Sequence, residues 1–110
     1  MTVAWVSVCP YSRLEPERGV VALVEGVQVA IFRTHDGELF ALDNLDPFSG
    51  AQVLSRGIVG SRGGTPTVAS PVFKQVFDLR SGSCLYRPDV VARTHPVRCR
   101  EGTVEVGWPH

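Results

Sequence analysis

Two segments, Asp46-Pro47-Phe48-Ser49-Gly50 and Ser70-Pro71-Val72-Phe73, decide how this chain of 110 residues is interpreted. Each contains a proline and follows an apolar run, which is typical of a loop that leaves a strand. Together their side chains offer a metal one carboxylate and two serine hydroxyls, because a phenylalanine ring has no donor atom. A single carboxylate does not make a site for a hard cation, and a serine hydroxyl is a poor ligand for iron. We therefore expect these loops to hold no metal ion.

The rest of the sequence predicts strands joined by tight turns. Glu25-Gly26, Asp36-Gly37 and Glu101-Gly102 each separate two apolar runs, and glycine accepts the positive φ that a hairpin turn requires. The expected strands cover residues 2–8, 20–24, 27–34, 38–42, 57–60, 67–69, 75–79, 97–100 and 103–106. This pattern predicts an all-β fold, an antiparallel β-sandwich of about nine or ten short strands with two protruding loops. We expect a single domain over residues 1–110.

Two segments are expected to depart from this strand pattern. Residues 61–66 are polar and rich in glycine, which is typical of a mobile loop. Residues 87–93 are expected to hold a helical turn that starts near Pro88-Asp89.

Composition and charge exclude several classes of partner. Eleven basic and eleven acidic residues give a formal net charge of zero. Nucleic acids and anionic membranes select a basic excess, so neither is expected as the main partner. The sequence has no run of about 18 apolar residues that could span a bilayer. Its N-terminus has no basic segment followed by an apolar stretch, so we expect a cytoplasmic protein.

The cysteines do not form a recognisable metal motif. Cys9, Cys84 and Cys99 are far apart, and no Cys-x-x-Cys pair is present. The alternation around Cys99 predicts that it is a small core residue on the same face as Val97. A metal site built from the three cysteines and His95 is an alternative, because ligands distant in sequence can converge in space.

In spacing, the two loops resemble the metal-binding loops of Rieske iron–sulfur domains. Each Rieske loop supplies one Cys and one His to a [2Fe–2S] centre. Asp46 and Phe48 stand at the ligand positions of the first loop, and Ser70 and Phe73 stand at those of the second. The resemblance implies a Rieske-like fold that has been kept after its redox centre was lost.

Three stretches narrow this resemblance. Residues 41–51, the strand-like segment 54–60 and residues 68–82 are similar to the small subunit of bacterial NAD(P)H-dependent nitrite reductase. That similarity extends from Trp5 to Val106. It implies a non-catalytic subunit, with no catalytic, cofactor-binding or metal-binding residue of its own, in the assimilatory reduction of nitrite to ammonium. The implied partner is the large subunit, which in this family carries FAD, siroheme and a [4Fe–4S] cluster.

Without a metal, the loops have two possible uses. The rings of Phe48 and Phe73 can pack into the space that a cluster would occupy. The loop ends can also form a docking surface, since aromatic groups suit the core of an interface and Lys74 and Gln75 suit its polar rim. The candidate partner interface consists of Pro47, Phe48, Phe73, Lys74 and Gln75.

Two other functions compete with the accessory subunit. One is a Rieske-type ferredoxin that carries electrons, which the missing ligands disfavour. The other is an unrelated β-sandwich protein-interaction module.

Overall fold

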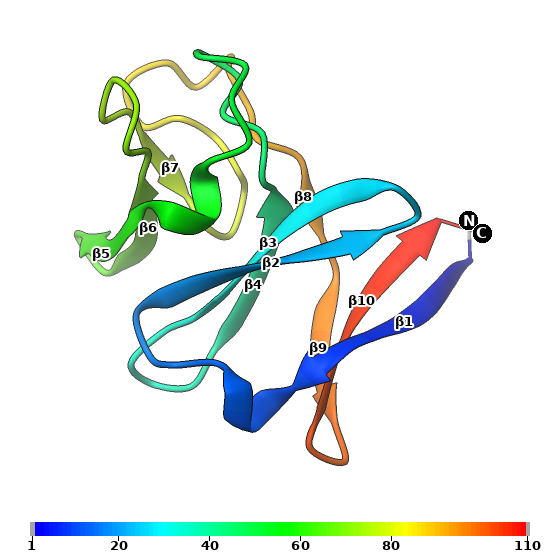
Figure 1. Ribbon diagram of the computed structural model, residues 1–110. Helices are drawn as coiled ribbons and strands as arrows, with labels where there is room; N and C mark the ends of the chain where they lie inside the picture. The colour runs from blue at the N-terminus through cyan, green and yellow to red at the C-terminus, as the bar shows by residue number, and fades with distance from the viewer. Residues whose placement is uncertain (1, 110) are drawn as a thin grey trace.

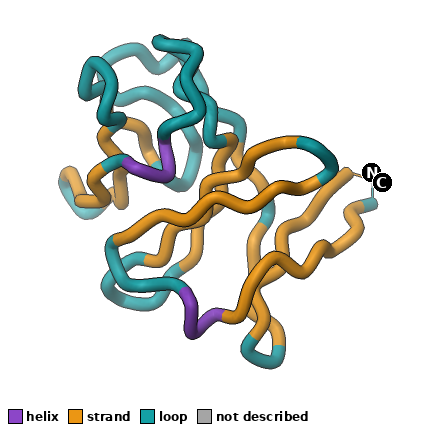
Figure 2. Tube along the Cα trace, in the orientation of Figure 1, coloured by secondary structure: helices purple, strands orange, loops and turns teal. Residues whose placement is uncertain are grey.

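The computed structural model describes residues 2–109, which form ten strands and two short 3₁₀ turns (Figures 1 and 2). The strands are β1 (Val3–Pro10), β2 (Arg18–Val24), β3 (Val27–Arg33), β4 (Leu39–Asp43), β5 (Ile58–Arg62), β6 (Thr65–Ala69), β7 (Val76–Asp78), β8 (Thr94–His95), β9 (Val97–Arg100) and β10 (Thr103–Pro109). The 3₁₀ turns are η1 (Tyr11–Arg13) and η2 (Leu54–Arg56). Within residues 2–109 no helix is long and apolar enough to cross a membrane. The all-β prediction is confirmed.

The strands pair antiparallel in three sheets, ordered β1-β10-β9, β2-β3-β4-β8 and β5-β6-β7. The predicted turns join them where expected. Glu25 and Gly26 have φ of 49° and 81°, and Glu101 and Gly102 have φ of 51° and 79°. Positive φ at both central residues matches the right-handed twist of the flanking strands, which is why these dipeptides close hairpins.

Strand β3 lies at the centre of the fold because both of its faces are buried. Phe32 packs with Phe77 of β7 in one core cluster, whereas Ile31 packs with Val104 of β10 in the other. All four of these side chains are fully buried. The sheet that contains β3 is therefore the middle layer of the molecule, and it supports the β5–β6–β7 sheet from one side.

The chain ends and the β5–β6–β7 sheet lie at opposite ends of the molecule. Val3 at the start of β1 pairs with Pro109 at the end of β10. Figure 1 shows these strand ends at the right of the view and the β5–β6–β7 sheet, with the loops above it, at the left. The predicted loops are consequently remote from both termini.

Residues 61–66 form a hairpin, so the prediction of a mobile loop was wrong. Ser61 pairs with Pro66 and Arg62 with Thr65. Only Gly63-Gly64 is left as the turn, with φ of 58° and 85°. Two adjacent residues with positive φ make a two-residue hairpin loop, which extends β5 and β6 instead of separating them.

Three local predictions were wrong in whole or in part because tertiary pairing decides the outcome. Residues 87–93 hold the expected turn only at Pro88-Asp89, where the Val90 N–H donates to the Arg87 carbonyl at 2.8 Å. The turn does not continue as a helix, because Val91 bridges to Ser83. Residues 54–56 form η2 instead of a strand. Cys99 is exposed, because β9 is an edge strand and its end extends beyond the core.

We predict that Gly57→Ala destabilises the β5–β6–β7 sheet. A Cβ atom at Gly57 would lie 2.5 Å from the Ala69 carbonyl oxygen and 2.6 Å from a Val68 methyl carbon. Relieving that overlap requires a shift of β5 away from β6 and costs about 1–3 kcal/mol of unfolding free energy. Gly60→Ala is the matched control, since the nearest atom to its Cβ is 3.9 Å away. Equal urea denaturation midpoints for the two variants would contradict this account.

Candidate functional site

The candidate site is formed by loop 1 (residues 44–53), between β4 and η2, and loop 2 (residues 70–75), between β6 and β7. A hydrogen bond joins the two loops: the Ser70 hydroxyl donates to Asp46 Oδ2 at 2.5 Å. Both residues are buried, with exposed fractions of 0% for Asp46 and 1% for Ser70. Asp46 and Ser70 stand where the two Rieske loops carry their cysteine ligands. In this chain the side chains at these two positions are hydrogen-bonded directly to each other.

The carboxylate of Asp46 also shapes loop 1. Its Oδ1 accepts the Phe48 N–H at 2.8 Å and the Ser49 N–H at 3.4 Å. The Asp46 N–H donates to the Ala51 carbonyl, and the Gly50 N–H donates back to the Asp46 carbonyl, both at 2.8 Å. This use of an aspartate to satisfy the backbone two residues ahead is typical of tight turns. One side chain thus closes loop 1 and connects it to loop 2.

Ser70 plays the corresponding part in loop 2. Its N–H donates to the Gln75 carbonyl at 2.8 Å, and its hydroxyl oxygen accepts the Val72 N–H at 3.2 Å. Because buried polar groups are costly unless they are hydrogen-bonded, the two loops must stay together to satisfy both side chains.

Asn44 anchors the start of loop 1 and was missed by the sequence analysis as a functional residue. Its side-chain amide donates to Gln28 Oε1 at 3.0 Å, and its Oδ1 accepts the Ser55 N–H at 2.7 Å. Its carbonyl accepts the N–H groups of Val53 and Leu54. Asn44 therefore joins both ends of the loop to the middle sheet. An asparagine between a predicted strand and a predicted loop was the available signal.

The two phenylalanines at the other ligand positions behave differently. Phe48 is partly buried, and its ring centroid lies 6.1 Å from that of Phe77. Phe73 is 70% exposed. The backbone of Phe73 and of Lys74 is left-handed, with φ of 59° and 55°. Phe48 therefore packs against the core, as one of the two expected uses requires, whereas Phe73 does not, because the turn in loop 2 holds its ring in solvent.

The remaining candidate interface residues are divided between surface and interior. Pro47 and Lys74 are exposed. Gln75 is only partly exposed, and its Oε1 accepts a hydrogen bond from the Cys84 thiol at 3.5 Å. Gln75 is thus turned toward the core instead of forming a polar rim.

The donor set does not fit a [2Fe–2S] cluster. Asp46 and Ser70 use their oxygens on each other and on the loop backbone, while the other two positions carry phenyl rings. In the part of the chain between Thr2 and Pro109, no three His, Cys, Asp or Glu side chains gather to hold a metal ion. The alternative site from Cys9, Cys84, Cys99 and His95 is therefore not assembled.

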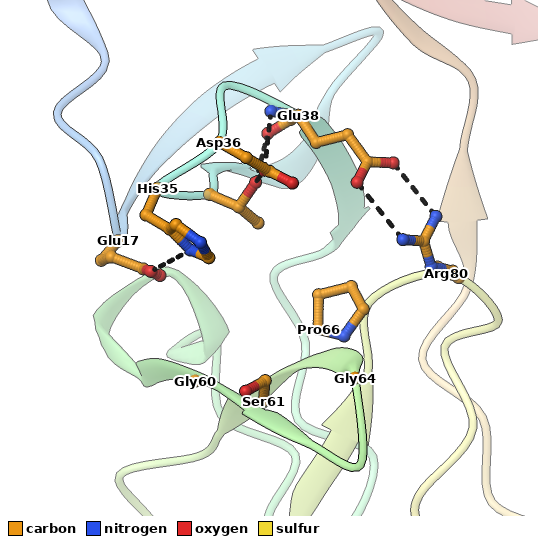
Figure 3. A pocket seen from close by; sticks show the side chains of 10 residues that line it. Glu17, His35, Asp36, Glu38, Gly60, Ser61, Gly64, Pro66 and Arg80 are labelled. Carbon is orange, nitrogen blue, oxygen red and sulfur yellow. Dashed lines mark hydrogen bonds and ion pairs between the residues drawn. The ribbon is translucent and has the colours of Figure 1, made fainter.

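A second feature, not foreseen from the sequence, is a cavity of about 310 Å³ between the β3–β4 turn and the β5–β6 hairpin (Figure 3). Its polar groups are engaged with one another. Arg80 pairs with Glu38 at 3.0 and 3.3 Å. The pKa of the Asp36 carboxyl is lowered because the Thr34 hydroxyl and then the Glu38 N–H donate to it. The Arg80–Glu38 pair joins the β3–β4 turn to the segment that follows β7, and the bonds to Asp36 lie within the turn itself.

The family comparison covers almost the whole chain. Residues 4–107 match the family described as a Rieske-like [2Fe-2S] domain. Over 103 residues the chain is 40% identical to the nitrite reductase (NADH) small subunit of Salmonella typhimurium. The aligned region covers 93% of this chain and 95% of that protein. It is also 40% identical to part of the nitrite reductase NAD(P)H large subunit of Klebsiella oxytoca, covering 94% of this chain and 11% of that protein.

Solved structures give the same result. The chain is 47% identical to a putative NADH-dependent nitrite reductase small subunit from Mycobacterium tuberculosis, with a TM-score of 0.96 over 100% of this chain and 99% of that one. The ferredoxin of carbazole 1,9a-dioxygenase from Nocardioides aromaticivorans is 24% identical, with a TM-score of 0.76 over 96% of this chain and 97% of that one. This second likeness supports the shared fold alone.

We predict that Ser70→Ala lowers stability by about 1–3 kcal/mol, because it leaves a buried oxygen of Asp46 without its donor. Urea unfolding measures the change. Ser83→Ala is the matched control: the Ser83 hydroxyl also donates to an oxygen, the Pro88 carbonyl at 2.9 Å, but in a solvent-exposed turn. Equal losses in the two variants would show that burial of the Asp46–Ser70 bond is unimportant.

We also predict that the wild-type protein, isolated anaerobically from iron-replete cells, contains no stoichiometric iron and has no visible absorption from a cluster. The matched control restores a Rieske ligand set with Asp46→Cys, Phe48→His, Ser70→Cys and Phe73→His. Elemental analysis and the visible spectrum are the measurements. A reddish-brown wild-type preparation with bound iron would overturn the assignment of these loops.

Proposed function

Because this chain belongs to the Rieske-like domain family and, within it, to the nitrite reductase (NADH) small subunits, we propose that it is the non-catalytic small subunit of an NAD(P)H-dependent nitrite reductase. The observation that carries the proposal is the hydrogen bond between Asp46 and Ser70. It keeps the two loops joined where the iron ligands of a Rieske centre are absent. The subunit then supports nitrite reduction to ammonium through contact, without relaying electrons.

The Klebsiella oxytoca relative supports this contact. Its large-subunit polypeptide includes a segment that aligns with 94% of this chain. A covalent link holds two parts of one chain at a high effective concentration, which favours an interface between them. In the proposal, a separate large subunit takes that place here and carries the FAD, siroheme and [4Fe–4S] cluster. The complex would act in nitrite assimilation in the cytoplasm.

The exposed tips of the two loops, Pro47 in loop 1 and Phe73 and Lys74 in loop 2, are the first part of the proposed interface and are called the loop ends below. Phe73 exposes 70% of its surface to solvent. Its left-handed φ and that of Lys74 place strain of the order of 1 kcal/mol or more in each residue, and such strain gathers at functional sites. Aromatic rings are enriched in the centres of protein interfaces. Pro47, also exposed, completes this surface, whereas Phe48 and Gln75 support it from below.

The hydrogen-bonded loop bases explain how such a surface can bind well. Each loop is closed by its own backbone bonds, and Asp46 connects the two. A surface that is already ordered loses less conformational entropy on association than a mobile one. The subunit therefore offers its partner a preformed contact.

We predict that Phe73→Asp and Lys74→Glu each weaken binding to the purified large subunit by about tenfold or more. Burying a new carboxylate, or reversing a charge at the rim, disfavours association without disturbing the core. The measurements are the Kd of the complex and its nitrite-dependent NAD(P)H oxidation. Leu23→Asp is the matched control, since Leu23 is 72% exposed on β2.

Melting temperatures equal to wild type would confirm that both loop variants are folded. If both then bound the large subunit with wild-type affinity, the loop ends would not be part of the interface. If the wild-type chain itself failed to bind the large subunit, the proposed function would be wrong.

A further inference from the structure

The outward face of β5 exposes a large apolar side chain beside an aromatic one. Val59 of β5 packs against the core, so its neighbour Ile58 faces outward, where it is 78% exposed. Tyr86 is 68% exposed, and its hydroxyl accepts a hydrogen bond from Arg62 Nη1 at 2.8 Å. Arg62 lies two positions after Gly60 and four after Ile58, on the same face of the strand.

This face is continuous with loop 2. Ile58 pairs with Ala69, and Ala69 pairs with Val76. Cross-strand partners lie side by side on one face of a sheet. Ala69 directly precedes loop 2, so Ile58 lies at the end of β5 that is near this loop, which carries Phe73. This row of cross-strand partners is covered beyond Ala69, because Val76 is only 6% exposed.

The charges in this part of the chain all have the same sign. Residues 47–77 contain three charged side chains, Arg56, Arg62 and Lys74, and no Asp or Glu. The remaining residues carry eight basic and eleven acidic side chains. None of the three cations forms an ion pair with a described residue. The three cations are thus not neutralised by an ion pair. Glu17 is the acidic side chain that lines the groove beside Ile58, and it lies 3.2 Å from His35.

We propose that the β5 face docks an acidic surface of the nitrite reductase large subunit. This inference rests on the function proposed above. The β5 face is defined by Arg56, Ile58, Arg62, Phe73, Lys74 and Tyr86. Its apolar centre with a charged rim is the usual anatomy of a protein interface. Unpaired cations of one sign favour a partner with carboxylates at the corresponding positions, and they accelerate the encounter.

The position of the chain ends agrees with this orientation. The strand ends at Val3 and Pro109 lie at the end of the molecule opposite the β5–β6–β7 sheet (Figure 1). In the Klebsiella oxytoca relative, where 94% of this chain aligns inside a longer one, the connecting polypeptide leaves from that opposite end. The β5 face and the loop ends then stay free to contact the rest of the large subunit.

A groove lies beside Ile58 on the β5 face. It is open to solvent, has a volume of about 590 Å³ and is lined by residues 17–19 and 55–59. A partner side chain can enter a groove of this kind next to an apolar centre, as hot-spot residues do.

The test measures the affinity and association rate of the purified large subunit for variants of the β5 face. Ile58→Glu should weaken the Kd by about tenfold or more. Arg56→Glu should slow association and reduce its dependence on salt. The matched controls, Leu23→Glu on β2 and Arg100→Glu on β9, change exposed residues of the same kinds on other strands and should bind like wild type. Tyr86→Ala is a second, milder probe of the apolar centre.

Each outcome decides between the two proposals. If Phe73→Asp weakens binding while folded Ile58→Glu and Tyr86→Ala bind normally, the interface is limited to the loop ends and the β5 face is excluded. If the controls weaken binding as much as the β5 variants, the contact is not specific to this face. If the chain binds anionic phosphatidylglycerol vesicles but not the large subunit, both the β5 docking surface and the proposed function are overturned.

Discussion

A buried hydrogen bond between the Ser70 hydroxyl and the Asp46 carboxylate joins the two loops, and the surface that they present depends on it. Hydrogen bonds to an ionised group are shorter and stronger than neutral ones. A metal cluster would connect the same loops through four ligand bonds. Here one bond between side chains does so, and it suffices because Asp46 and Ser70 also satisfy the backbone within their own loops.

The middle sheet of the fold, β2-β3-β4-β8, fixes the position of the two loops. Phe32 of β3 and Phe77 of β7 share one core cluster, which fixes the β5–β6–β7 sheet relative to the sheet behind it. Asn44 adds a polar connection, because its side chain bonds to Gln28 on β3 and to the Ser55 N–H after loop 1. Packing and hydrogen bonding therefore restrain the same few residues, so the loop ends are held by the core instead of by a metal.

The sequence predicted what depends on local chemistry and missed what depends on distant partners. Glu25-Gly26 and Glu101-Gly102 were recognised because a hairpin turn requires positive φ at both residues. The missing metal ligands could be read from residue types alone. The bond between Asp46 and Ser70 could not, since 24 positions separate them and neither residue type specifies the other. The hairpin around Gly63-Gly64 was misjudged because its composition is also that of a loop.

Phe48 and Phe73 illustrate how the loss of a cofactor can divide one set of positions into two roles. Both stand where the resemblance expects a histidine ligand, yet Phe48 packs against Phe77 and Phe73 is 70% exposed. If both rings only replaced the volume of a cluster, both would be buried, because exposing an aromatic ring forgoes the free energy of burial. The backbone of loop 2 instead holds Phe73 outward in a left-handed conformation. In the proposed function, folding and contact fall to different residues: Asp46, Ser70 and Phe48 maintain the loops, and Phe73 contacts the partner.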